Sequence, residues 1–384
     1  NGYLTFDDPW LVDHTTSTEY VILGADEWFE IGSHGITKAP TDMPLVANGI
    51  VYIAQGDTTD MRRFREYNNA GTWTIDWASE STNSNKADLL AVVDDATNGP
   101  TVWRVLNDTV EASYSVVKAW GTDLDFGTTN KPVGEVTEKA TQLVAYVDPY
   151  NEEPIPYVIK KGSLWAYKNS AWKKVPLDEM KTIQSETTGL SALVHNTYLY
   201  FSMLNGLELW TDNLLQDVGP TKDRGLPQNR IGPIATMLGY PGRFFAGVDG
   251  KSSNISSILM NHGLDEWEEH YRAPIAGRRI RATGFQVVPG DHPDRLFFLE
   301  ANDLMWLSFP SGHTNPLTDS GYLFCPEAAI TLSRIHAGMQ DVRKLWAAVK
   351  VVADNLLEDS QWIELDYKLD DETAAWTTLD TRFD

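Results

Sequence analysis

The residues that most resemble a metal site lie in the stretch HGLDEWEEH, where His262, Glu266 and His270 are spaced four apart. On a helix this spacing would place the three side chains on one face, where they could act as zinc ligands. The stretch contains a glycine and lies among strand-like sequences, so we interpret the spacing as coincidental. We therefore predict no metal ligands here.

An acidic stretch, DLDFG, begins like a calcium-binding loop because Asp123 and Asp125 are two residues apart. The further oxygen ligands and the terminal glutamate of such a loop are missing. We predict a solvated acidic turn, with a loop-bound Ca²⁺ as the alternative, and no other cofactor.

Signatures of catalysis are weak throughout the chain. The nearest approach to the Ser-x-Asp-x-Gly-x-x-Trp turn of sialidases is NHGLDEW at Asn261, which lacks the Ser-x-Asp start and the following glycine. Arg278, Arg279 and Arg281 resemble an arginine cluster, but they alternate along one predicted strand and cannot all face one pocket. There is no Gly-x-Ser-x-Gly nucleophile elbow, and we interpret Cys325 as a small buried hydrophobe. We predict no catalytic residue and no enzyme activity.

One basic stretch, MRRFREY, stands out because it brings Arg62, Arg63 and Arg65 together in a strongly acidic chain. On a strand, Arg63 and Arg65 would share one face, and Arg62 and Phe64 the other. Two interpretations remain open: solvated arginines on an outer strand, or a docking patch for an acidic neighbour such as another copy of this chain. These arginines are the only candidate interface residues.

The elements around these residues are short strand-like runs that recur with a period. Each unit has a small apolar run, a turn with Gly, Asn, Asp or Pro, and then a more aromatic run. A repeat of about 40 to 50 residues with four strands is typical of a β-propeller blade. We therefore predict an all-β fold with six to seven blades, and favour seven. The units begin near Met43, Ala87, Ala140, Thr188, Arg230 and Arg279.

Two further regions complete the predicted ring. EYVILGAD and EWFEIG, residues 19–32, match the outer strands of a blade, and we expect one blade to combine strands from both ends of the chain. The stretch GSLWAYKNSAWKKVP carries Trp165, Tyr167 and Trp172 on a predicted hairpin. Outer strands diverge from one another, so we predict that Trp165 and Trp172 fill the space between blades. A platform for stacking sugars is the alternative.

The pattern changes near the C-terminus, so we assign residues 1–320 to the propeller and residues 321–384 to an antiparallel β-sandwich segment, incomplete or completed by another chain. The stretch beginning at Gln340 fits a helix or a strand, and we favour a strand. IELDYKLDDETAAW predicts a hairpin around its Asp-Asp pair, with Trp376 packing back on it.

Composition limits the function classes. The formal net charge of −23 argues against nucleic-acid binding, because a polyanion would be repelled. No apolar run approaches the roughly 18 to 20 residues that cross a bilayer, so we expect no membrane insertion. A single cysteine excludes an internal disulfide.

The organisation resembles that of the propeller-plus-sandwich virion structural proteins of tailed bacteriophages. The resemblance is carried by GYPGRFFAGVDGKSSNISSILMNHGLDEWEEHY, GFQVVPGDHPDRLFFLEANDLMWLSFPSG and WIELDYKLDDETAAW, between residues 230 and 376. It implies a non-enzymatic or host-contacting part located in the virion, an extracellular particle. Its implied partners are other virion proteins, further copies of the chain and a host-surface glycan; no site residue is transferred.

We therefore expect a non-enzymatic virion protein whose propeller is a scaffold for protein–protein assembly and for host attachment. The alternative is a secreted propeller-fold glycan-active enzyme, a hydrolase or lyase, in which carboxylates and an arginine would converge in the central channel. A cellular surface adhesin is a third alternative, disfavoured because the opening residues, NGYLTFDDPW, lack a charged-then-apolar leader.

Overall fold

The structure is a computed structural model of the 384-residue chain, which forms two compact units, residues 1–327 and 328–384. The described residues are 2–5, 21–23, 28–30, 42, 45–48, 50–67, 72–76, 86–95, 98–118, 124–126, 129–147, 153–177, 185–211, 214–220, 228–240, 242–263, 266–286, 294–301, 303–309, 363–367 and 377–383.

Six four-stranded antiparallel sheets make up the first unit, and each sheet is one blade of a β-propeller. The innermost strands are β4 (Leu45–Ala47), β10 (Leu89–Asp95), β14 (Ala140–Tyr146), β18 (Ala192–His195), β22 (Ile234–Tyr240) and β26 (Ile280–Gln286). The second strands are β5 (Ile50–Ile53), β11 (Gly99–Leu106), β15 (Ile155–Lys160), β19 (Tyr198–Met203), β23 (Arg243–Val248) and β27 (Asp294–Glu300). The third strands are β7 (Arg62–Tyr67), β12 (Glu111–Val116), β16 (Ser163–Lys168), β20 (Gly206–Thr211), β24 (Ser257–Gly263) and β28 (Asp303–Phe309). The fourth strands are β8 (Thr72–Asp76), β13 (Lys131–Pro132), β17 (Ala171–Lys174), β21 (Leu214–Asp217), β25 (Glu266–Arg272) and β1 (Gly2–Thr5).

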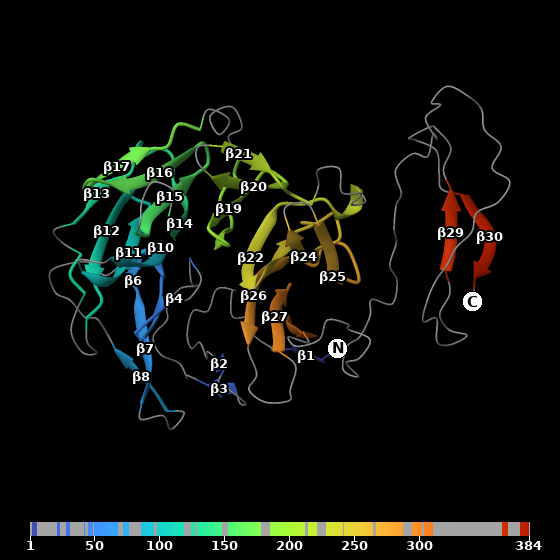
Figure 1. Cartoon of the computed structure of the whole chain (residues 1–384). Coiled ribbons are helices and arrows are strands. Elements are labelled where there is room, and N and C mark those ends of the chain that lie inside the picture. The colour runs from blue at the N-terminus through green and yellow to red at the C-terminus, as the bar shows by residue number, and fades with distance from the viewer. Residues whose placement is uncertain are drawn as a thin grey trace. The chain divides into compact units, whose positions relative to one another are not determined.

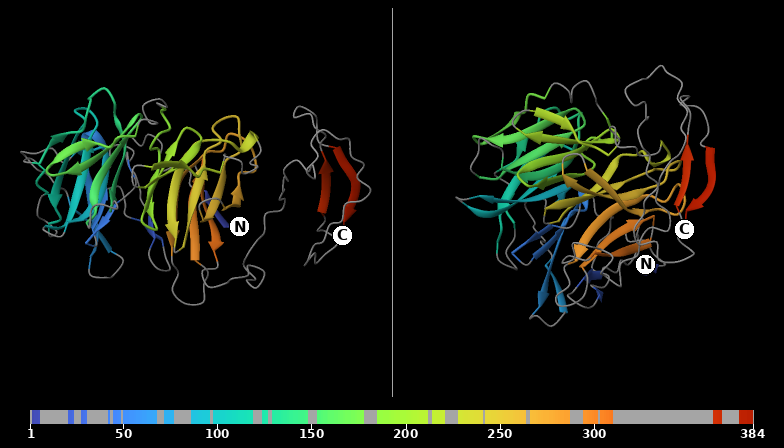
Figure 2. Two further views of the ribbon diagram at one scale, coloured as in Figure 1. Left: turned by 45° about the horizontal axis from the view of Figure 1, so that its top comes forward. Right: turned by 45° about the vertical axis from the view of Figure 1, so that its right-hand side comes forward.

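The blades follow one another in chain order around the ring, from blue to orange in Figure 1. Each innermost strand from β4 to β22 contacts the innermost strand of the next blade. Figure 2 shows the same succession of sheets from two further directions. The predicted all-β propeller is therefore confirmed. Six four-stranded blades are present among the described residues, rather than the favoured seven.

The sixth blade combines strands from distant parts of the sequence, as expected. β1 is its fourth strand and pairs antiparallel with β28, from Gly2 opposite Trp306 to Thr5 opposite Asp303. The strand that closes the blade is not the one predicted. Residues 19–32 instead hold a separate two-stranded sheet, β2 (Val21–Leu23) with β3 (Trp28–Glu30). A short connection favours pairing between the two strands that it joins over pairing with a distant edge.

Turn geometry follows from residue type. Asn169 and Ser170 connect β16 and β17 with φ of 52° and 61°, and Asn196 and Thr197 connect β18 and β19 with φ of 48° and 69°. Two consecutive residues with positive φ are the signature of a type I′ hairpin turn, whose twist matches that of the flanking strands. The hairpin predicted from KNSAW is thereby confirmed.

Aromatic and aliphatic side chains fill the space between neighbouring blades. The ring of Trp103, in the second blade, lies 4.8 Å from Tyr167 and 5.9 Å from Trp172, both in the third. Trp172 is 9% exposed, and Trp165 packs against the same cluster. The prediction that Trp165 and Trp172 lie between blades is confirmed. Similar buried clusters join the first and second, third and fourth, fourth and fifth, and fifth and sixth blades.

A separate two-stranded sheet pairs β6 (Gly56–Asp60), which lies in the chain between β5 and β7 of the first blade, with β9 (Lys86–Ala87), which lies just before the second blade. The described residues contain one 3₁₀ turn, η1 (Gln228–Arg230), and no α-helix. Among them, accordingly, no helix has the length and apolarity needed to span a membrane.

The second unit contains the hairpin predicted near the C-terminus. β29 (Ile363–Tyr367) pairs antiparallel with β30 (Thr377–Phe383), with Tyr367 opposite Thr377. The sandwich stays a prediction, because the segment from Gln340, together with Cys325 and Trp376, lies outside the described residues.

Candidate functional site

The candidate site is one end of the propeller, formed by two kinds of connection. In a four-stranded meander, the turn between the second and third strands emerges at the same end as the linker to the next blade. Backbone hydrogen bonds hold the linkers to the blades: Gly189 N donates to Ser202 O, near the end of β19, at 2.8 Å, and Ala301 N, in the turn after β27, donates to Arg279 O at 2.7 Å. We name this end the linker face; it comprises the second-to-third-strand turns and the inter-blade linkers.

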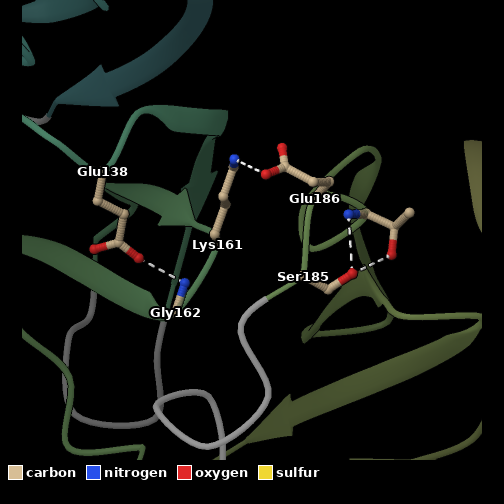
Figure 3. Close-up of polar contacts among 6 residues, drawn as sticks. Glu138, Lys161, Gly162, Ser185 and Glu186 are labelled. Atoms are coloured by element: carbon tan, nitrogen blue, oxygen red, sulfur yellow. Dashed lines mark hydrogen bonds and ion pairs between the residues drawn. The ribbon is translucent and has the colours of Figure 1, made fainter.

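A carboxylate fixes the linker face at the third blade. Glu138, on the linker before β14, accepts hydrogen bonds from Gly162 N at 2.6 Å and from Ser163 Oγ at 2.9 Å. Lys161, in the same turn, forms an ion pair with Glu186 on the linker that follows the blade. Figure 3 shows the turn between these two carboxylates. One short turn is therefore tied to the linkers on both sides of its blade.

The same linker is held from inside the blade. The ammonium of Lys160 is buried, donates to Glu135 O at 2.9 Å and lies 5.9 Å from the centre of the Trp165 ring. Burial lowers the pKa of Lys160, and the charges of Glu138 and Glu135 oppose that shift. The linker approaches the ring at Gly134, whose φ is +65° and where a Cβ atom would lie 2.3 Å from the indole. Only glycine fits this approach.

The following linker is ordered by hydroxyl groups. Ser185 Oγ accepts a hydrogen bond from Thr187 N at 3.2 Å and shares another with Thr187 Oγ1 at 2.8 Å. Thr187 Oγ1 also donates to Leu204 O, in the turn of the fourth blade, at 2.7 Å. Local hydroxyl bonds of this kind stabilise turns without regular secondary structure.

Two arginines are held at the fifth and sixth blades by buried carboxylates. Arg278 Nη1 lies 3.3 Å from Glu300 Oε1 and 3.2 Å from Asp303 Oδ2. The Tyr271 hydroxyl donates to Glu300, and burial together with this carboxylate raises the pKa of Tyr271. The side chain of Glu300 is 1% exposed, and Arg278 and Tyr271 supply the polar contacts that its burial requires.

The neighbouring Arg279 is bound to a different carboxylate. Its Nε donates to Asp249 Oδ2 at 2.7 Å, and the side chain of Asp249 is 2% exposed. The hydrogen bond and the charge of Asp249 raise the pKa of Arg279. Arg278 and Arg279 thus serve different carboxylates, in agreement with the argument that the arginines of GRRIR do not face one pocket. The side chain of Arg281 lies outside the described residues.

Exposed apolar side chains stand among these ordered polar groups. Ile275 is 60% exposed on the linker before the sixth blade, and Val136 is 58% exposed on the linker before the third. Leu190 and Leu204, on the linker and turn of the fourth blade, are 45% and 46% exposed. Their positions on the linkers and turns of this end make it a candidate for a binding surface.

The predicted arginine patch lies on β7, which is the third strand of its blade and pairs with β5 and β8. Arg63 is 0% exposed and Arg62 is half-buried, so the interpretation as solvated arginines on an outer strand is wrong for these two. Burial lowers the pKa of Arg62, and the charge of Asp60 opposes the shift. The side chain of Arg65 lies outside the described residues, and a docking role for this strand stays a prediction.

The suspected metal residues are placed as follows. His262 is on β24, whereas Glu266 and His270 are on β25, so their spacing spans a hairpin and not one helical face. Asp125 is exposed and its backbone N donates to Ser115 Oγ at 2.9 Å; Asp123 lies outside the described residues. Over the described part of the chain, no group of three or more His, Cys, Asp or Glu is arranged to hold a metal ion.

Comparison with known proteins gives fold-level similarities only. No protein-family model and no curated protein matches the sequence. The chain is similar to the extracellular domain of a hybrid two component system from B. thetaiotaomicron at 11% identity and a TM-score of 0.49, over 79% of this chain but only 39% of that protein. It is similar to the Aleuria aurantia lectin at 16% identity and a TM-score of 0.38, over 68% of this chain and 88% of the lectin. A chain of the Mitotic Checkpoint Complex gives 10% identity and a TM-score of 0.49, over 81% of this chain and 94% of that one. None of these similarities bears on function.

Proposed function

We propose that the chain is a non-catalytic binding scaffold that docks other proteins on its linker face, as a structural protein of a tailed-bacteriophage virion. The observation that carries the proposal is the set of exposed apolar side chains, Val136, Leu190, Leu204 and Ile275, on loops that carboxylates hold in place.

Physical chemistry connects this surface to protein binding. The centre of a protein interface is apolar and is depleted of free charges, and its rim is polar. The charges of Arg278 and Arg279 are already paired within the chain, so a partner can cover the face without leaving them uncompensated. The bonded turns need little further ordering when a partner binds, which reduces the entropic cost of association.

The resemblance to virion propeller proteins supplies the context of the proposal. A particle protein, or a further copy of this chain, is the partner proposed for the linker face, and the protein would be located in the extracellular particle. A rigid ring suits this role because it presents many loops in fixed positions. Attachment to a host-surface glycan is the second role that the resemblance implies.

The test is incorporation into particles. Ile275→Asp and Leu204→Asp place a charge on the linker face. Leu214→Asp is the matched control because Leu214 is 59% exposed at the start of β21, at the opposite end. In a phage whose own copy is deleted, we expect each linker-face variant to lower the number of copies per purified particle by about tenfold, equivalent to roughly 1.4 kcal/mol. The control should be incorporated like the unmodified chain.

Two outcomes would contradict the proposal. The chain could be absent from purified particles, or all three variants could be incorporated equally. The enzyme alternative is tested separately by incubating the protein with bacterial surface polysaccharides. Release of new reducing ends or unsaturated sugars would identify a hydrolase or a lyase and would overturn the non-catalytic role.

A further inference from the structure

The start of the chain joins the propeller by strand pairing in the sixth blade. Five buried apolar clusters join consecutive blades, from the first with the second to the fifth with the sixth. Within the described residues, no such cluster joins the sixth blade to the first. What links the sixth blade to the start of the chain is the pairing of β1 with β28.

β1 is held by strand pairing on one side only. Among the described residues it pairs with β28, from Gly2 opposite Trp306 to Thr5 opposite Asp303, and with no other strand. A strand paired on one side opens at a lower free energy than a core strand. When β1 leaves, β28 becomes an edge strand whose sequence, DLMWLSF, is mostly apolar. An unpaired apolar edge is a template for another strand.

We propose that β1 is exchanged between copies, so that β1 of one chain completes the sixth blade of a second chain. The exchanged strand makes the same pairs with β28 as the strand that it replaces, from Gly2 opposite Trp306 to Thr5 opposite Asp303. Exchange therefore loses no strand pairing, which is why swapping of an identical element is a low-cost route to oligomers.

The chain between β1 and the first blade is long enough for this exchange. The segment between β1 and β4 has 39 residues, 6 to 44. For comparison, the linker between β25 and β26 has seven residues. The 39-residue segment spans at most about 130 Å when extended. Within the described part of the segment, β2 and β3 pair with each other and not with a blade.

The inference goes beyond the proposed function and does not depend on it, because none of the four exposed apolar side chains proposed for docking lies on β1 or β28. It gives the predicted homo-oligomer a defined contact, the outer edge of the sixth blade. Formation of an exchanged dimer is second order in chain concentration. The fraction of exchanged chains should therefore increase where copies are held side by side at high local concentration.

The experiment uses paired cysteines in a chain whose only cysteine has been removed by Cys325→Ser. Tyr3 lies opposite Met305, and directly opposed residues of antiparallel strands have Cβ atoms about 5 Å apart, within reach of a short bismaleimide. One chain carries Tyr3→Cys, and a second chain of different length carries Met305→Cys. The control replaces the second chain with one that carries Leu214→Cys, which is 59% exposed and belongs to the fourth blade.

We expect the mixed chains to form a cross-linked heterodimer whose fraction rises at least about tenfold when the protein is concentrated from roughly 1 µM to 1 mM. The Leu214→Cys control should give only the collisional background. A heterodimer fraction no greater than this background would overturn the exchange.

A chain that carries both Tyr3→Cys and Met305→Cys checks the starting state. At low concentration it should cross-link within one chain, which shows that β1 occupies its own sixth blade. If it cross-links neither within nor between chains, the pairing of β1 with β28 is wrong and the proposal fails. Ile275→Asp should leave the exchange unchanged. Failure of docking on the linker face can therefore be distinguished from failure of strand exchange.

Discussion

Replacing Gly134 with alanine tests whether the inter-blade linker is packed against the aromatic layer as the structure places it. Gly134 has φ of +65°, and an added Cβ atom would lie 2.3 Å from Cζ2 of Trp165. The indole cannot easily move away, because its Nε1 donates to Ser163 Oγ at 2.9 Å and its ring packs in the cluster between the second and third blades.

The expected cost has two parts. An alanine with positive φ costs about 1 to 2 kcal/mol relative to glycine, and forcing a methyl group into a filled space costs about 1 to 3 kcal/mol more. Gly134→Ala should therefore lower the free energy of unfolding by about 2 to 5 kcal/mol. Gly99 provides a matched control, because its φ is +70° and nothing lies within 4 Å of the position of its Cβ atom. Gly99→Ala should lower the free energy of unfolding by only the positive-φ cost of about 1 to 2 kcal/mol.

Urea unfolding followed by tryptophan fluorescence measures both variants under the same conditions. A second arm places Gly134→Ala in a Trp165→Ala background, where the ring is absent and the added methyl group should be nearly as well tolerated as at Gly99. If Gly134→Ala is no more destabilising than Gly99→Ala, or if removal of Trp165 does not reduce its cost, the packing of the linker on the ring is wrong.

Three further predictions concern buried groups. Glu300→Gln removes the charge that compensates the partly exposed Arg278, and it should lower the free energy of unfolding in urea by about 1 to 3 kcal/mol. Trp103→Leu removes a ring that contacts the third blade, 5.9 Å from Trp172, and should cost about 2 to 4 kcal/mol, seen as faster hydrogen exchange on both sides of this boundary. Burial lowers the pKa of His195, so the folded state binds its proton less readily than the unfolded state does. The folded state is therefore favoured above pH of about 6.5, and it loses this advantage as pH falls below that value and the histidine of the unfolded chain becomes protonated. His195→Gln should show a smaller decrease in thermal midpoint between pH 7 and pH 5 than the unmodified chain.

The repeat is the part of the fold that sequence predicts well. Predicted unit starts at Ala140 and Arg279 fall within one residue of β14 and β26, and the start at Met43 lies two residues before β4. This works because a blade imposes a local pattern, with small residues on the inner strand and aromatic residues farther out, and each copy repeats that pattern. Turn chemistry is local as well, which is why Asn169 and Ser170 were identifiable as a hairpin turn.

Burial of charge is the part that sequence predicts poorly. Charge alone suggests that MRRFREY is exposed, but β7 is paired on both sides and Arg63 is buried between neighbouring elements. The long aliphatic part of arginine can be buried when its guanidinium finds partners. Those partners come from other parts of the chain, so residue type by itself does not reveal them.

The residues that organise the linker face have no motif for the same reason. Glu138 binds Gly162, 24 residues later, and Asp249 binds Arg279, 30 residues later. Each pair joins a linker to a turn of the adjacent blade, so it becomes recognisable only when the topology places the two together. An acidic residue in a predicted linker, about half a repeat from a glycine-containing turn, is a weak signal that could have indicated Glu138 in advance.

The two proposed contacts make different demands on the ring. Docking on the linker face needs turns that do not move, and the bonds of Glu138, Asp249 and Glu300 hold those turns to the blades. Strand exchange needs the outer strand β1 to leave the sixth blade while the blades stay together, and the apolar clusters still join consecutive blades, from the first to the sixth, when β1 leaves. A mutation within those clusters should therefore weaken both contacts, because it loosens the whole ring. A mutation of Tyr3 in β1 should affect the exchange alone, since Tyr3 lies opposite Met305 and not opposite Asp303, the residue that pairs with Arg278 on the linker face.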